Sequence, residues 1–470
     1  MPRFLQNTFL LLFSAILVYG AWLYGDVFVQ SGFVKRLKWE KQFAPAEFST
    51  AYEQEFTQFL SKKRHPIITS LATFKWEALD LSFIQRVEKG RDGWLFLKEE
   101  VPGRNELLQS LGIRPYTNFE LKMWSLLIEQ RAEWTSGLGM KYVLLIVPNK
   151  ASIYPEYLPA RDHRVAPRST LKLLRHLSGV EVIDLTSSVF NQKGLGQLYH
   201  KYDTHWNELG AFAAYQGLMR ALPAPFNDAP LPLDSFIIDQ EIKRDGDLAR
   251  MMLMDSSLSE RVPRLKLRQQ RAQCRTGCNE PFEPFMSPKL FSNPQARLSK
   301  VFFDHDSFFK ALAPFVAEHF QASFFSWQWQ GFHWDVIESE RPALVVDEFV
   351  ERSLIGDRPR NSPPILQAYW QKHFQDLPEV RRFEAQNLRQ AFRQIESIRL
   401  ESDAIPVVQL ELQPSTAAQL LVEYDDKVIS YPLEANQPNT IFLEWEPLRM
   451  KDLRLEQGGT VSLSVQVRKY

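Results

Sequence analysis

Two polar residues that could cooperate in proton transfer lie in the segment YDTHWNELGAFAAY, residues 202–215. Asp203 and His205 are two positions apart, just before a stretch whose start suits Asn207 as a helix N-cap. A carboxylate beside a histidine can fix the imidazole tautomer and stabilise its protonated form. The spacing also fits a capping aspartate next to a half-buried histidine, which is the commoner arrangement, so the motif alone leaves both interpretations open.

A serine in the segment KVFFDHDSFFKALAPFVAEHF, residues 300–320, could supply a nucleophile. Ser307 follows an apolar strand pattern at the point where the pattern turns helical. On such a strand-to-helix turn, backbone N–H groups at the helix start can point at a developing oxyanion. The Gly-x-Ser-x-Gly signature of hydrolase nucleophile elbows is absent, and taken alone Ser307 is more simply explained as a helix N-cap.

Near-continuous apolar runs predict the strands that would carry these residues, because such runs are typical of strands buried on both faces. The runs are Tyr142–Val147, Val180–Leu185, Lys300–Asp304, Ser323–Trp327 and Ala343–Phe349. Helical patterns alternate with them, notably over residues 118–134 and 208–222. The alternation predicts an α/β fold with a parallel sheet flanked by helices, whose active site lies at the carboxyl ends of the strands.

The pattern changes after about residue 400, where short segments of period two are separated by turn residues. These segments predict an antiparallel β-sandwich of roughly six strands. A preceding stretch rich in Gln and Arg predicts a helical connector. The predicted organisation is a membrane anchor over residues 1–30, a helical stalk or subdomain over 31–85, an α/β domain over 86–368, the connector over 369–400 and the sandwich over 401–470.

The N-terminal residues predict a membrane-spanning segment. No charged residue occurs from Phe4 to Gly25, a stretch long enough for one bilayer crossing. No clean small-x-small cleavage site follows, so we expect an uncleaved anchor with the bulk of the chain outside the cytoplasm. Nucleic acid is not an expected partner, because 56 Lys and Arg balance 56 Asp and Glu and phosphate binding needs a basic excess.

The two cysteines, Cys274 and Cys278, bracket Arg-Thr-Gly. A structural zinc would need four ligands, and the chain has no second cysteine pair. We therefore predict a local disulfide, which favours an oxidising compartment, with two free thiols as the alternative.

Four blocks together resemble the DHHW/AlgJ/AlgX-like polysaccharide O-acetyltransferases, membrane-linked relatives of the SGNH hydrolases. The blocks are GRDGWLFL (90–97), VPNKASIYPEYLP (147–159), YDTHWNELGAFAAY (202–215) and FDHDSFFKALAPFVAEHF (303–320). The resemblance implies an SGNH hydrolase-like fold and a catalytic triad of Ser307, His205 and Asp203. His205 would take the serine proton and Asp203 would orient His205.

Other residues are predicted to belong to the site, but on less specific grounds than the triad. The backbone amide of Phe308 would help to hold the oxyanion, and Asn149 and Tyr202 could contact substrate, although a turn and simple packing are their plain alternatives. His305 with His205 and Asp203 could make a two-His-one-carboxylate metal site. That site would leave the serine turn unexplained, so no metal ligand is predicted.

The resemblance implies that acetyl groups pass through Ser307 to hydroxyls of an exported polysaccharide, without a diffusible cofactor. Implied partners are the polysaccharide acceptor, a membrane-bound O-acyltransferase that supplies acetyl, and other export subunits. The implied location is the bacterial inner membrane, single-pass, with the catalytic domain in the periplasm. A carbohydrate acetylesterase of the SGNH type would use the same residues. A catalytically silent polysaccharide-binding or scaffold subunit is the third alternative, because His305 and Phe309 replace the smaller residues usual in the family.

Overall fold

The computed structural model describes residues 86–99, 105–159, 168–177, 179–252, 254, 257–278, 288–328, 331–354, 361–400, 403–424, 428–445, 450–456 and 461–470. All of them belong to one compact unit, residues 72–470. The predicted membrane anchor (1–30) and helical stalk (31–85) lie outside the described residues. Within the described residues, no helix has the length and apolar character needed to cross a bilayer.

A seven-stranded sheet in the order β4-β3-β11-β9-β10-β8-β7 forms the centre of the described residues. Its strands are β3 (Lys141–Val147), β4 (Glu181–Asp184), β7 (Gln273–Thr276), β8 (Lys289–Ser292), β9 (Leu298–His305), β10 (Phe320–Trp327) and β11 (Leu344–Val350). The five strands from β4 to β10 run parallel, as predicted. β8 pairs antiparallel with β10, and β7 pairs antiparallel with β8 at the edge of the sheet. Neither strand was predicted from the apolar runs, because both are short and only partly buried.

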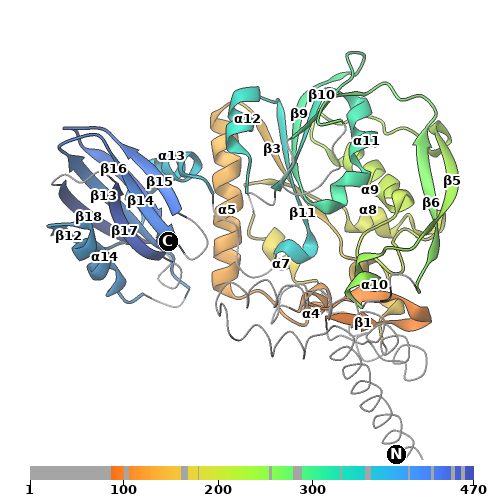
Figure 1. Cartoon of the computed structure of the whole chain (residues 1–470), viewed down its shortest axis with the longest axis horizontal. Coiled ribbons are helices and arrows are strands. Elements are labelled where there is room, and N and C mark those ends of the chain that lie inside the picture. Colours follow the sequence, from red (N-terminus) through yellow and green to blue (C-terminus); the bar gives the residue numbers. More distant parts are fainter. Residues whose placement is uncertain are drawn as a thin grey trace, which may run out of the picture. The chain divides into compact units, whose positions relative to one another are not determined.

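Helices cover both faces of this sheet (Figure 1). One face packs against α5 (Asn118–Gly137), α7 (Thr170–Leu174) and α12 (Trp334–Glu340), and the other against α8 (Thr186–Phe190), α9 (Glu208–Ala221) and α11 (Ala313–Val316). Strand β3 shows why both faces are buried. Val143 and Leu145 pack on the α9 side, whereas Leu144 and Ile146 pack on the α5 side. An apolar run with no polar alternation is therefore the pattern that this position requires.

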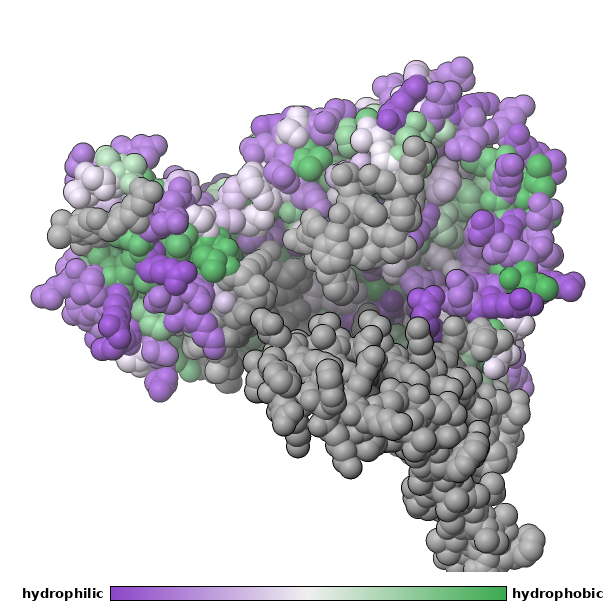
Figure 2. All heavy atoms as spheres, viewed as in Figure 1, coloured by the Kyte–Doolittle hydropathy of each residue, from purple (hydrophilic) through white to green (hydrophobic). Residues whose placement is uncertain are grey.

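Smaller elements surround the sheet. They are β1 (Val87–Lys89), β2 (Leu95–Leu97), α4 (Glu106–Ser110), α6 (Lys150–Ile153), β5 (Phe236–Lys243), α10 (Asp247–Met251) and β6 (Glu260–Leu267). Strands β5 and β6 form a separate two-stranded antiparallel sheet. Its surface carries hydrophobic patches among polar residues (Figure 2), to which the exposed Ile237, Ile238 and Ile242 contribute.

The C-terminal residues form the predicted antiparallel sheets. The strands are β13 (Pro406–Pro414), β14 (Ala418–Tyr424), β15 (Val428–Leu433), β16 (Asn439–Glu444), β17 (Met450–Glu456) and β18 (Val461–Lys469). Together with β12 (Glu379–Ala385) they make a four-stranded sheet, β12-β18-β13-β16, and a three-stranded sheet, β15-β14-β17. Alternate residues of the two sheets share one buried core, for example Val408 and Leu410 of β13 with Leu420 and Val422 of β14.

The helical connector predicted for residues 369–400 is wrong in part. The region contains the end of α13 (Pro363–His373), a strand, β12 (Glu379–Ala385), and α14 (Leu388–Glu396). β12 pairs with β18 at the edge of the sandwich, so the sandwich begins before residue 401. The strand was missed because its sequence, EVRRFEA, is rich in charge and mostly exposed, which is typical of an edge strand and resembles a polar helix.

Candidate active site

Three central strands end at the same edge of the sheet, where the predicted chemistry should lie. Ser307 follows the end of β9, Asn149 and Lys150 follow β3, and Arg352 follows β11. His205 comes from the loop before α9. The N-terminus of this helix forms as predicted, because the Asn207 side chain accepts hydrogen bonds from the amides of the second and third helical residues.

The structure brings Ser307, His205 and Asp203 into one chain of hydrogen bonds. His205 Nε2 lies 2.7 Å from Ser307 Oγ, and His205 Nδ1 lies 2.7 Å from Asp203 Oδ1. Ser307 is about a hundred residues from the other two in sequence, so this contact depends on the fold. The arrangement allows Nδ1–H to donate to the carboxylate while Nε2 accepts the proton of Oγ.

Asp203 is held in one orientation by donors on both of its oxygens. Oδ1 also accepts the His205 amide at 3.0 Å, and Oδ2 accepts the Asp247 amide at 3.2 Å and lies 3.1 Å from Lys243 Nζ. Burial raises the pKa of this carboxyl, but the hydrogen bond and charge of His205 and the charge of Lys243 outweigh it, so the pKa lies well below its ordinary value. Asp203 is therefore a carboxylate that can stabilise an imidazolium.

Asp306 fixes the turn that carries Ser307. The turn is a short 3₁₀-helix over residues 307–311 capped by Asp306, whose Oδ1 accepts the Phe308 amide at 2.9 Å. Its Oδ2 accepts the Val350 amide at 2.8 Å, which ties the turn to the end of β11. The Phe308 amide is thus already paired and is a poor candidate for the predicted oxyanion contact. The Ser307 amide is at the first position of this helix, where an N–H group has no intrahelical acceptor.

A buried carboxyl pair lies beneath this turn. Glu348 Oε2 accepts the Asp306 amide at 2.7 Å. Burial, and then the neighbouring charge of Asp306, raise the pKa of Glu348 well above its ordinary value. Burial likewise raises the pKa of Asp306. Two buried carboxyls this close favour a state that retains a proton.

The two bulky residues that flank the serine turn face the core. His305 is fully buried, with Nδ1 2.7 Å from the Asp306 carbonyl and its ring against Phe309 and Phe325. Phe309 is fully buried against Phe303 and Phe325. Neither side chain therefore occupies the space in front of Ser307 Oγ, where their bulk could have blocked a substrate.

A small pocket lies next to the triad loop, which contributes Thr204 to its lining. Its lining includes Asn149, Lys150, Thr204 and Arg352. The half-buried Arg352 has its guanidinium 5.1 Å from the centre of the ring of Phe308, the residue next to the serine.

The two residues predicted to contact substrate have different positions in the structure. Asn149 lines this pocket, with Nδ2 donating to Ser110 Oγ at 2.7 Å. Tyr202 does not line it. The Tyr202 ring instead packs against a small buried cluster that includes Leu95, Leu248 and Met252, which corresponds to the packing alternative.

The possible metal ligands differ from the combination considered from sequence. Among the described residues, one group of three could surround an ion, Asp203, His205 and Asp247, and His305 is not part of it. The side-chain atoms of this group that could bind an ion already have other partners. Nδ1 of His205 bonds Asp203, Asp203 pairs with Lys243, and Asp247 accepts the Thr204 amide and hydroxyl. An ammonium group in contact with the central carboxylate fits a proton-transfer site better than a cation site.

Sequence reasoning missed Lys243 and Asp247, which both reach the triad loop from 40 or more residues away. No local pattern marks them. The one available signal is Gly246, because a Cβ at this position would lie 2.3 Å from the Tyr202 carbonyl oxygen. A glycine is needed here so that the backbone before α10 can pass directly against the triad loop.

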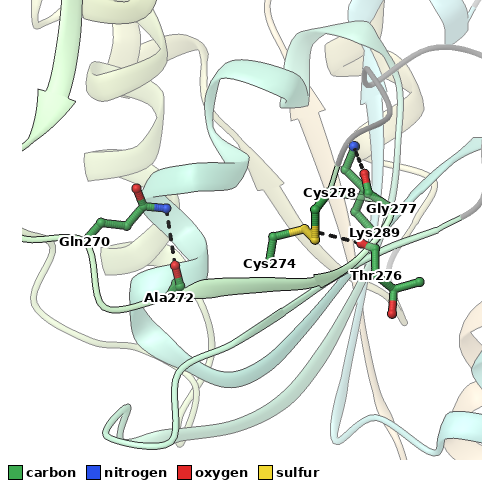
Figure 3. Close-up of a disulfide and its surroundings, with 7 residues drawn as sticks. All are labelled: Gln270, Ala272, Cys274, Thr276, Gly277, Cys278 and Lys289. Carbon is green, nitrogen blue, oxygen red and sulfur yellow. Dashed lines mark hydrogen bonds between the residues drawn. A yellow bond between two sulfur atoms is a disulfide. The ribbon is translucent and has the colours of Figure 1, made fainter.

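The cysteines predicted to pair do so. Cys274 and Cys278 form a disulfide at the end of β7 (Figure 3), next to Lys289, which donates to the Gly277 carbonyl. The link closes a small loop at the edge of the main sheet, far along the sheet order from β3 and β11. Its contribution is therefore to local structure.

Comparison with known proteins shows what part of this chain is similar to. Residues 87–282 match the family model described as SGNH hydrolase-like domain, acetyltransferase AlgX. The predicted resemblance to the AlgJ/AlgX family is confirmed. The matched range contains Asp203 and His205 but ends before Ser307. The position of Ser307 in the site therefore rests on its contact with His205.

The curated relatives are named as AlgJ proteins. The chain is 29% identical over 240 residues to the probable alginate O-acetylase AlgJ of Pseudomonas aeruginosa, covering 48% of this chain and 54% of that protein. It is 29% identical over 279 residues to the probable alginate O-acetylase AlgJ of Pseudomonas putida, covering 56% of this chain and 65% of that protein. The chain thus spans between half and two thirds of the length of these relatives. The solved O-acetyltransferase domain of Pseudomonas putida AlgJ aligns with a TM-score of 0.38 and 23% identity, over 60% of this chain and 97% of that one, a likeness too distant to support an argument.

Proposed function

We propose that this chain is an O-acetyltransferase that carries an acetyl group on Ser307 and delivers it to a hydroxyl of an exported polysaccharide. The observation that supports this most directly is the uninterrupted chain of hydrogen bonds from Ser307 Oγ through His205 to Asp203, with both links at 2.7 Å. The names of the AlgJ relatives support acetyl transfer to a polysaccharide over other acyl chemistry.

The first half of the proposed reaction forms an acetyl-serine. Ser307 Oγ attacks the acetyl carbonyl of a donor ester while His205 Nε2 takes the hydroxyl proton. The imidazolium, stabilised by Asp203, then gives this proton to the departing alcohol as its bond to the acetyl carbon breaks. The Ser307 amide is the best-placed backbone donor for the negative charge that develops on the carbonyl oxygen.

The second half repeats these steps with a sugar hydroxyl as the nucleophile. His205 takes the proton of that hydroxyl, the sugar oxygen attacks the acetyl-serine, and the proton returns to Ser307 as its ester bond breaks. Water must be outcompeted by a positioned acceptor. The pocket lined by Asn149 and Arg352 is where we place that acceptor, because it offers an amide and a guanidinium beside the nucleophile.

The proposed location is the periplasm, with the chain held in the inner membrane by residues 1–30 and served by a membrane-bound O-acyltransferase as acetyl donor. The uncharged stretch 4–25 supports an anchor. The Cys274–Cys278 disulfide suits an oxidising compartment.

The experiment measures acetyl transfer and hydrolysis in the same tube. The purified full chain is incubated with 4-nitrophenyl acetate and an oligosaccharide, for example an oligomannuronate, and the products are weighed by mass spectrometry. Acetylated sugar is the expected product. Free acetate alone would instead indicate an esterase.

The Ser307→Ala variant is the matched control. We expect it to lose turnover and the acetyl-enzyme mass increment together. Products that form at a similar rate in wild type and Ser307→Ala would contradict the proposal, and an absence of both products in the wild type would favour the silent scaffold subunit.

A further inference from the structure

Lys150 is a buried lysine that points at the backbone of the triad loop. It is the first residue of α6, directly after β3, and its side chain is almost completely buried. Its Nζ donates to three carbonyl oxygens of the loop, those of His200 at 3.1 Å, Lys201 at 3.3 Å and Asp203 at 2.7 Å. An ammonium group has three N–H donors and no acceptor, so three converging carbonyls match its bonding capacity.

Two aromatic rings also lie next to the Lys150 ammonium group. The ammonium lies over the faces of two aromatic rings, 5.7 Å from the centre of Trp94 and 5.3 Å from that of Phe96. Such faces attract cations. Carboxylates lie nearby without a direct salt bridge to Lys150 among the described residues, so the backbone of the loop is its main partner. A side chain that serves three backbone carbonyls of one loop fixes the shape of that loop, here the segment that ends in Asp203 and His205.

We propose that Lys150 is a positioning residue for acyl transfer, which holds the Asp203–His205 loop in register with Ser307 through its three backbone hydrogen bonds. The inference rests on the proposed function and extends it, because it assigns Lys150 a role in preparing the nucleophile. The third carbonyl it holds belongs to Asp203 itself, two residues before His205. Small displacements of that loop change the 2.7 Å contact between Nε2 and Oγ directly.

The protonation state of Lys150 supports a pH dependence of this positioning. Burial lowers its pKa to about 8, against the attraction of Asp247, Asp203 and Glu260. A neutral amine has two N–H donors for three carbonyls and turns a lone pair toward the third. Other charged or titratable groups that face this region are His200, His205, Lys243, Glu106 and Arg352. Loss of the proton above pH 8 should therefore loosen the loop.

The test measures how fast Ser307 reacts with phenylmethylsulfonyl fluoride in the full chain between pH 6 and 10. The rate constant reports nucleophile activation by His205 and needs no acetyl acceptor. We expect the wild-type rate constant to fall above about pH 8. Lys150→Met should react at least about tenfold more slowly at pH 7 and show no further fall above pH 8. Lys150→Arg, which keeps its proton throughout this range, should retain more of the rate than Lys150→Met and lose the fall above pH 8.

Lys193→Met is the matched control. Lys193 also donates to a backbone carbonyl, that of Ile153 at 3.0 Å, and also lies over an aromatic ring, that of Tyr154 at 4.5 Å. It does not touch the triad loop, so we expect its substitution to leave the rate constant and its pH profile unchanged. Equal rate constants in wild type and Lys150→Met at pH 7 would overturn the proposal. A wild-type rate constant that does not fall above pH 8 would also overturn it, and this result does not depend on how well any variant folds.

A second readout separates this proposal from the proposed function. The ring N–H of His205 that bonds Asp203 should give a strongly downfield proton resonance, which is independent of turnover. Its loss in Lys150→Met and persistence in Lys193→Met would support the positioning role. Its persistence in both would refute that role. A wild-type Ser307 that does not react at any pH would contradict the proposed function and the positioning role with it, whereas a reactive Ser307 with equal rates in wild type and Lys150→Met would refute the positioning role alone.

Discussion

Replacing Asp203 by Asn tests whether the carboxylate sets the tautomer of His205. Both oxygens of Asp203 face donors, so an amide has no good orientation. If the Asn oxygen keeps the Oδ1 position, its NH₂ group faces the Lys243 ammonium and the Asp247 amide. If the amide rotates, its NH₂ group faces the His205 amide and Nδ1.

We expect the rotated orientation of the amide to be the more stable of the two. It makes one donor–donor contact in place of two, and the imidazole can adapt by accepting at Nδ1 and moving its proton to Nε2. Each avoided contact is worth about 1–3 kcal/mol, so roughly 85–99% of molecules would hold the wrong tautomer. An Nε2–H group cannot accept the proton of Ser307.

The loss of charge adds to the effect of the tautomer. A carboxylate about 4 Å from an imidazolium contributes up to ~4 kcal/mol at an effective dielectric constant of 20. We therefore expect kcat to fall by about 10³- to 10⁴-fold, which corresponds to roughly 4–5.5 kcal/mol in the barrier. KM should change little, because Asp203 is buried and does not face the pocket.

The assay is 4-nitrophenyl acetate turnover by the full chain, with Asp247→Asn as the matched substitution. Asp247 Oδ2 lies 3.5 Å from His205 Nδ1, but its bonds to the Thr204 amide and hydroxyl can be remade by an amide. We expect its effect to stay within about tenfold. Asp203→Asn activity within tenfold of wild type would refute the reasoning, and equal losses in both variants would show that charge outweighs orientation.

Three further predictions concern stability and are checked by urea unfolding of the full chain. The free energy of unfolding of wild type should rise relative to that of Lys150→Met as the pH rises from 8 to 10.5, by roughly 3 kcal/mol at most. The reason is that in this range the lysine of the unfolded chain still binds a proton that the folded chain has released. A difference that stays constant with pH would contradict this. Glu348→Gln should be close to wild type at pH 5 and more stable by a growing margin toward pH 7.5, because the folded carboxyl stays protonated while the unfolded one ionises; a growing deficit would mean that Glu348 is charged in the fold. Phe309→Ala should lose about 3–5 kcal/mol while the folded protein keeps its Ser307 labelling rate, and a faster rate would show that Phe309 obstructs the nucleophile after all.

The central sheet could be predicted because its information is local. A strand buried on both faces is mostly apolar without polar alternation, and β3, β9, β10 and β11 all contain such runs. The buried Asp347 and Glu348 of β11 are exceptions. β12 lacked that signal, since an edge strand satisfies half of its backbone with solvent and tolerates charge on both faces. Burial therefore decided which strands the sequence could reveal.

The candidate site divides in a similar way. Ser307, Asp203 and His205 could be found because nucleophile, base and carboxylate each sit in a recognisable local motif. The groups that hold them could not. Lys243 reaches Asp203 across 40 residues, and Lys150 reaches it across 53, through contacts with no sequence pattern. Lys150 was visible only as a polar residue at a strand end, which does not distinguish a substrate contact from a structural one.

The two loops that meet at the site are held by neighbouring strands. Lys150, three residues beyond the end of β3, holds the loop of Asp203, while Asp306 ties the serine turn to Val350 at the end of β11. β3 and β11 are adjacent and parallel, and Val147 pairs with Val350. The distance between His205 Nε2 and Ser307 Oγ is therefore governed by the register of two buried strands. The apolar runs predict these strands, and the strands position the loops. For this reason a site that is built from loops can be inferred from the sequence.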